Sequence, residues 1–131
     1  RCIIGNGCEI HGNVSNSVIS ANVVIEEGAI VRDSIIMDNT VIKKGTVVDK
    51  AIIAENVVIG EKCTIGTGEY ADSKLDTRVY ASDLVVIGEN STIPSNVTVG
   101  RNVAISGKTV ISDYPDGKLE SGDYIIKAGE I

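Results

Sequence analysis

Residues 19–66 read ISANVVIEEGAIVRDSIIMDNTVIKKGTVVDKAIIAENVVIGEKCTIG, and the aliphatic residues in this stretch recur at a spacing of six. The recurring positions form three triplets: Ile19, Ile25 and Val31; Ile36, Ile42 and Val48; Ile53, Ile59 and Ile65. Successive triplets are offset by 17 residues. A small or β-branched side chain occupies the intervening inward positions, namely Val23, Ala29, Thr40, Thr46, Val57 and Cys63. The six-residue spacing returns at Ile87, Ile93, Val99 and Ile105.

A period of six is neither the helical period of 3.6 nor the simple alternation of a long strand. It indicates a short strand followed by a tight corner, so that three units close one triangular coil of roughly 18 residues. Each coil would pair in parallel with the next and stack its aliphatic side chains into columns. The 17-residue offset implies one residue fewer at one corner, just before Ile36 and Ile53. We therefore expect an all-β fold, a single-stranded parallel β-helix, over roughly residues 4–111.

The composition of the 131-residue chain agrees with this fold and excludes several functions. Ile and Val supply 37 residues and Leu only three, which favours β structure over helix. Four Tyr are the only aromatic residues, since Phe and Trp are absent, and columns of stacked Ile and Val leave little room for large rings. A net charge of −6 without a basic run argues against nucleic-acid binding. The short apolar runs argue against a membrane span.

Two segments depart from the period, and they divide the chain into predicted parts. We expect N-terminal coils at 1–66, a loop insertion at 67–83, C-terminal coils at 84–112 and a capping tail at 113–131. The polar insertion has three open interpretations: a solvated excursion, a contact with another subunit or domain, or a ligand-binding lobe. A degenerate coil is a fourth, less favoured one.

The two ends of the repeat differ. The sequence Tyr114-Pro115-Asp116-Gly117 predicts a turn, and residues 123–127 predict a short strand that would protect the last rung. At the other end, Arg1 is not a start Met, and Cys2-Ile3-Ile4 enters the repeat without a cap. We expect from this that the chain is a fragment whose first rung is covered by an upstream segment.

The wording of the repeats is more specific than their period. The informative blocks are GCEIHGNVSNSVI at 7–19, DSIIM at 33–37, and LVVIGENSTIP at 84–94. Together they resemble the C-terminal domain of bacterial glucose-1-phosphate adenylyltransferases (ADP-glucose pyrophosphorylases), within the hexapeptide-repeat family. The resemblance implies a left-handed helix, an exception to the usual handedness of parallel crossovers.

The same resemblance implies a parent protein with an N-terminal nucleotidyltransferase domain, absent from this chain, that uses ATP, glucose 1-phosphate and Mg²⁺. In that family the β-helix domain helps to assemble a tetramer, and phosphorylated effectors bind near its junction with the catalytic domain. The chain itself would then have no catalytic residues, no cofactor and no metal. Some relatives carry Lys after the glycine that corresponds to Gly88, whereas this sequence has Glu89. An effector residue is therefore not carried over at that position.

The sequence offers few residues for a site. The candidates for effector or interface contacts are Arg78, Arg101, Lys74 and Tyr80, because guanidinium groups suit bidentate contacts to oxyanions. The single histidine, His11, is the candidate base of a hexapeptide acyltransferase. The three cysteines, Cys2, Cys8 and Cys63, match no zinc spacing and are expected as reduced thiols, with Cys8 and Cys63 in the core.

The main hypothesis is a cytoplasmic oligomerisation and regulatory domain of a glucose-1-phosphate adenylyltransferase, not catalytic by itself. Its expected partners are its own catalytic domain, homologous subunits and a phosphorylated metabolite, with neither nucleic acid nor membrane. Two alternatives stay open: a self-sufficient hexapeptide acyltransferase that uses acyl-CoA, and the β-helix domain of another sugar-nucleotide pyrophosphorylase.

Overall fold

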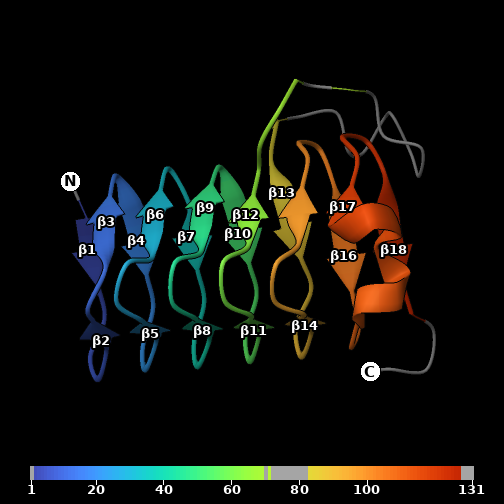
Figure 1. The fold of residues 1–131 in the computed structure, drawn as a ribbon. Coiled ribbons are helices and arrows are strands. Elements are labelled where there is room, and N and C mark those ends of the chain that lie inside the picture. The colour runs from blue at the N-terminus through green and yellow to red at the C-terminus, as the bar shows by residue number, and fades with distance from the viewer. Residues whose placement is uncertain (1, 70, 72–82, 128–131) are drawn as a thin grey trace.

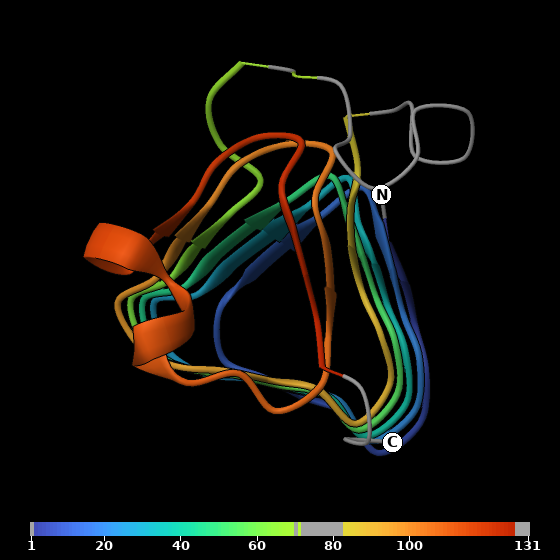
Figure 2. The same ribbon diagram turned by 90° about the vertical axis from the view of Figure 1, so that its right-hand side faces the viewer.

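The computed structural model describes residues 2–69, 71 and 83–127, and these residues form a prism of short parallel strands (Figure 1). Viewed along its axis, the prism has a triangular cross-section with one sheet on each side (Figure 2). Seen from the C-terminal end, the chain turns clockwise as it approaches the viewer, so the coils are left-handed. The expected parallel β-helix is therefore confirmed, and its handedness agrees with the family resemblance.

The three sheets contain every β-strand of the described residues. Sheet A has seven: β1 (Cys2–Ile4), β4 (Ser17–Ile19), β7 (Ile35–Ile36), β10 (Ala51–Ile53), β13 (Val85–Ile87), β16 (Ala104–Ser106) and β18 (Tyr124–Ile126). Sheet B has five: β2 (Glu9–Ile10), β5 (Val24–Ile25), β8 (Val41–Ile42), β11 (Val58–Ile59) and β14 (Thr92–Ile93). Sheet C has six: β3 (Asn13–Ser15), β6 (Ile30–Arg32), β9 (Val47–Asp49), β12 (Thr64–Ile65), β15 (Thr98–Val99) and β17 (Lys118–Leu119).

The predicted columns of aliphatic side chains form the core. Ile19, Ile36, Ile53, Ile87 and Ile105 are stacked in register along sheet A and are almost completely buried. Each such side chain contributes about 1.5–3 kcal/mol through burial. The first coil is less covered: Cys8, Ile10 and Val14 are only partly buried there, while Cys63 is fully buried as expected.

The corners are formed by residues that tolerate positive φ. At the corner from sheet A to sheet B, the asparagines at 22, 39, 56 and 90 all have φ between 56° and 60°. Asparagine visits this left-handed region at low cost because its short side chain can bond locally. The next corner uses Gly28 and Gly45, also at positive φ. The sequence therefore defines where each strand ends.

The segment between β12 and β13 leaves the prism without adding a rung to sheet A. Ala51 of β10 pairs directly with Val85 of β13, a register offset of 34 residues, whereas Ile35 of β7 and Ile52 of β10 are 17 apart. No strand lies between β10 and β13 in sheet A, which contradicts the less favoured interpretation of this segment as a degenerate coil. Its described residues depart at the corner between sheets C and A (Figure 2).

The C-terminal residues continue the helix as a shortened coil. The strand expected near residues 123–127 is β18, and β17 adds a further strand that the sequence did not predict. Two 3-10 turns, η1 (Ile111–Asp113) and η2 (Pro115–Gly117), lie where a sheet B strand would otherwise follow β16. Tyr114 lies between the turns and is buried as part of the core. A single ring thus fits where the columns end.

Candidate functional site

Two surface regions interrupt the regular prism, and the first is the corner from which the 67–83 segment departs. Asp49, at the end of β9, lies between two arginines: its carboxylate is 3.5 Å from Arg32 Nε and 3.5 Å from Arg101 Nη2. Arg101 Nε also donates a 2.8 Å hydrogen bond to the carbonyl of Gly68. We call Arg32, Asp49, Gly68 and Arg101 the Asp49 corner. One guanidinium thus links the prism to the start of the departing segment.

Neighbouring residues reinforce the Asp49 corner. Asn102 is buried, and its side-chain amide donates a 3.0 Å hydrogen bond to the carbonyl of Ala71. Gly66 has φ of 87°, and a Cβ at this position would overlap the carbonyl oxygen of Asp49. Only glycine can therefore make the turn there without moving the backbone. The departing segment is anchored at its root by specific contacts.

An open pocket of about 550 Å³ lies beside this root, between residues 67–71 and the last coil. Its charged lining residues are Glu69, Lys118 and Glu120. Two carboxylates against one ammonium disfavour an anion, because like charges repel in a partly desolvated site. The pocket therefore does not fit a phosphorylated metabolite as its described residues stand.

The structure places the predicted site residues in different circumstances. Arg101 is mostly buried and contacts Asp49 and Gly68, so its guanidinium is already engaged by the protein. Lys74, Arg78 and Tyr80 lie outside the described residues. His11 is exposed on the first coil, and its imidazole has no hydrogen-bond partner among the residues that the structure describes. No described constellation supports it as a base.

A buried polar group near the C-terminal end was not anticipated from the sequence. The Tyr114 hydroxyl lies 2.8 Å from Thr109 Oγ1, and burial raises the pKa of Tyr114 to about 12. Burial likewise raises the pKa of the Cys63 thiol. Both shifts favour the neutral form, so these groups act as core residues and not as nucleophiles. The Pro115-Asp116-Gly117 turn after Tyr114 was the only sequence signal for this arrangement.

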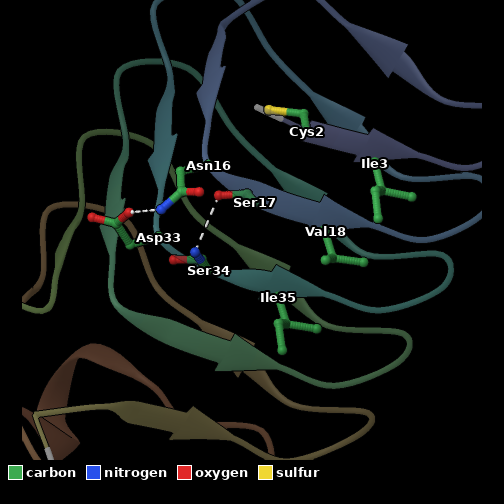
Figure 3. Close-up of a pocket in the computed structure, with 8 residues that line it drawn as sticks. All are labelled: Cys2, Ile3, Asn16, Ser17, Val18, Asp33, Ser34 and Ile35. Carbon is green, nitrogen blue, oxygen red and sulfur yellow. Dashed lines mark hydrogen bonds between the residues drawn. The ribbon is translucent and has the colours of Figure 1, made fainter.

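The second region is an open groove of about 360 Å³ at the N-terminal end of sheet A (Figure 3). One wall carries Ile3, Val18 and Ile35, which stack on successive strands and point outward. The opposite wall is polar, where Asn16 Nδ2 donates a 2.6 Å hydrogen bond to Asp33. The remaining lining residues are Cys2, Ser17 and Ser34. The groove therefore combines an apolar wall with a hydrogen-bonding rim.

The serines of this groove serve the fold. Ser17 Oγ donates to the carbonyl of Ser15 at 2.8 Å and accepts from the backbone N–H of Ser34 at 3.1 Å. Ser34 Oγ repeats the pattern one coil later, donating to Arg32 and accepting from Ala51. Because these hydroxyls are already used at the corner, Ser17 and Ser34 are not candidate nucleophiles.

The described residues include no group of three or more His, Cys, Asp or Glu side chains that could hold a metal ion. The Mg²⁺ implied by the family resemblance therefore has no ligand set in this part of the chain. No helix among the described residues is long and apolar enough to cross a membrane.

Comparison with known proteins identifies close relatives. A family model described as "GlmU-like, C-terminal hexapeptide" matches residues 1–87. Glucose-1-phosphate adenylyltransferase from Lachnospira eligens is 64% identical over 130 residues, covering 99% of this chain and 31% of the relative. The enzymes of that name from Thermotoga neapolitana and Thermotoga maritima are 55% and 56% identical, covering 98% and 95% of this chain and 30% and 29% of their own lengths. The chain thus spans about 30% of the length of these relatives.

Proposed function

The chain belongs to the GlmU-like C-terminal hexapeptide family, and we propose that it is the non-catalytic C-terminal domain of a glucose-1-phosphate adenylyltransferase. The observation that carries the proposal is identity of 64% across 99% of this chain to an enzyme of that name, confined to 31% of that enzyme's length. The absence of a catalytic constellation among the described residues supports the same assignment.

In this proposal the reaction takes place on the remaining part of the polypeptide. ATP and glucose 1-phosphate would react there to give ADP-glucose and diphosphate, with Mg²⁺ neutralising the charge on the phosphates. The β-helix would act as a rigid support for that part and for neighbouring subunits in a tetramer. Long stacks of buried Ile and Val suit this role, because a close-packed interior transmits displacement without deforming.

Regulation by a phosphorylated metabolite and a cytoplasmic location complete the proposal. Three cysteines without disulfide bonds favour a reducing compartment. We assign no effector residue, since Arg101 is engaged at the Asp49 corner and the other three candidates lie outside the described residues.

A chimaera tests the proposal directly. This chain would replace the matching 31% of the Lachnospira eligens enzyme, and diphosphate release would be measured with ATP and glucose 1-phosphate. We expect the chimaera to be active and the 131-residue chain alone to be inactive. A folded but inactive chimaera, or turnover by the chain alone, would contradict the assignment.

The two alternatives give different results in the same set of assays. An acyltransferase would release CoA from acyl-CoA with the chain alone, and His11→Ala would abolish that release. A domain from another sugar-nucleotide pyrophosphorylase would yield a chimaera that assembles poorly, because its interface would be adapted to a different catalytic part.

A further inference from the structure

A continuous apolar row runs along the outer face of sheet A. In register from strand to strand, it consists of Ile3, Val18, Ile35, Ile52, Val86, Ala104 and Tyr124. Ile3 is 69% exposed, and Val18, Ile35, Val86 and Tyr124 are 36–41% exposed. The row begins at the groove of Figure 3, whose apolar wall is formed by its first three members. We call it the sheet A row.

The other two faces of the prism differ from this one. Outward positions of sheet B begin with Glu9 and end with Thr92, and those of sheet C begin with Asn13 and end with Lys118. Among the described residues, no exposed large hydrophobic side chain lies on a strand of sheet B or sheet C. Exposed large hydrophobics instead lie on sheet A strands or at Val110 and Ile111.

The fold does not require this difference. Inward residues of all three sheets fill the same kind of core, so stability alone would permit polar outward residues on sheet A as on the other faces. A contiguous apolar patch on one face of a soluble domain usually marks an interaction surface.

The size of the patch selects its occupant. Seven strands at the usual spacing and about three residues of strand length give an area near 30 Å by 10 Å, or about 300 Å². A stable contact between separate copies needs about 800 Å² on each partner. A domain tethered within the same polypeptide needs far less, because the tether raises its effective concentration to the millimolar range.

We propose that the sheet A row is the docking face for the catalytic part of the same polypeptide. This inference rests on the proposed function, in which the remaining 69% or so of the relatives' length belongs to the parent protein. The matching surface would be apolar in its centre, flanked by Lys, Arg or amide donors. Those donors would meet the rim of Asn16 and Asp33 and the further carboxylate of Asp83, which is 3.8 Å from Lys50 Nζ.

Matched substitutions in the chimaera test this inference. Ile35→Lys and Val86→Lys place charges in the sheet A row, while Val41→Lys and Thr92→Lys place them at outward positions of sheet B in the same coils. Docking is followed by thermal unfolding and by small-angle X-ray scattering. Removing a buried aliphatic contact should weaken docking by about ten- to hundredfold per residue.

We expect the sheet A variants to unfold in two separate transitions with a larger radius of gyration, and the sheet B variants to behave as the unsubstituted chimaera. Equal behaviour of the two pairs would overturn the proposal. So would a radius of gyration that changes on dilution, since that result would assign the row to a second copy.

Two controls keep the result interpretable. The same substitutions in the 131-residue chain should leave its unfolding temperature nearly unchanged, and Ile35→Ser replaces Ile35→Lys if the lysine variant does not fold. Adenylyltransferase activity of the unsubstituted chimaera reports on the proposed function separately. An active chimaera with no effect of the sheet A substitutions would refute the docking face alone.

Discussion

Two columns of aliphatic side chains run the length of sheet A, one inside the prism and one on its outer surface. Ile36 and Ile35 are neighbours in the sequence, yet Ile36 is fully buried and Ile35 is 40% exposed. The inward column is common to all three sheets and makes the fold. The outward column is apolar throughout only on sheet A, so its side chains are explained by an interaction and not by the core.

The largest expected difference between the columns concerns stability. Ile36→Ala should lower the free energy of unfolding by about 2–5 kcal/mol, because it leaves a cavity in a closely packed column. Ile35→Ala should cost under about 1 kcal/mol in the isolated chain. Urea unfolding of the two variants measures both values. Equal losses would mean that the outer column also stabilises the domain.

A threonine pair sharpens the same comparison. Thr46 is fully buried, donates a 2.6 Å hydrogen bond to the carbonyl of Gly60 and accepts one from the backbone N–H of Cys63. Thr46→Val leaves both groups unpaired and should cost about 1–3 kcal/mol. Thr46→Ser retains the hydroxyl, and Thr64→Val changes an outward position, so a loss in either variant as large as that in Thr46→Val would argue against the hydrogen-bond explanation.

The closed end of the core should respond to alkali. The pKa of Tyr114 is about 12 in the folded protein because of burial, against 10 for an unperturbed tyrosine. The unfolded chain loses this proton first, so stability should fall as the pH rises from about 10 towards 12. Tyr114→Phe should flatten that decline. Thermal unfolding across this range compares the two proteins, and parallel curves would mean that Tyr114 is not the titrating group.

The smallest expected effect on stability concerns the Asp49 corner. Arg101→Met removes the contacts to Asp49 and Gly68, and we expect a loss of only about 1 kcal/mol because the pair is partly exposed. The local effect should be clearer: limited proteolysis near residues 67–71 should become faster. Arg32→Met, which removes only an ion pair to Asp49, is the control and should leave the cleavage rate unchanged.

The inward columns could be predicted from the sequence because a six-residue period requires identical environments in every coil. The shortened last coil could not, since Lys118–Leu119 is too short to show a period. Arg101 was correctly selected as a notable side chain, but its partners Asp49 and Gly68 are 52 and 33 residues away. The sheet A row escaped notice because an outward Val or Ile resembles an inward one until the register of the corners is known.

The claim that one face of the prism is a docking face can be tested most directly by hydroxyl-radical footprinting. Oxidation of Val18, Val86 and Tyr124 would be measured by mass spectrometry in the isolated chain and in the chimaera, with Val24, Val41 and Val58 of sheet B as internal controls. We predict that the sheet A side chains become strongly protected in the chimaera while the sheet B side chains do not change. Equal oxidation of Val86 and Tyr124 in the two proteins would contradict the claim.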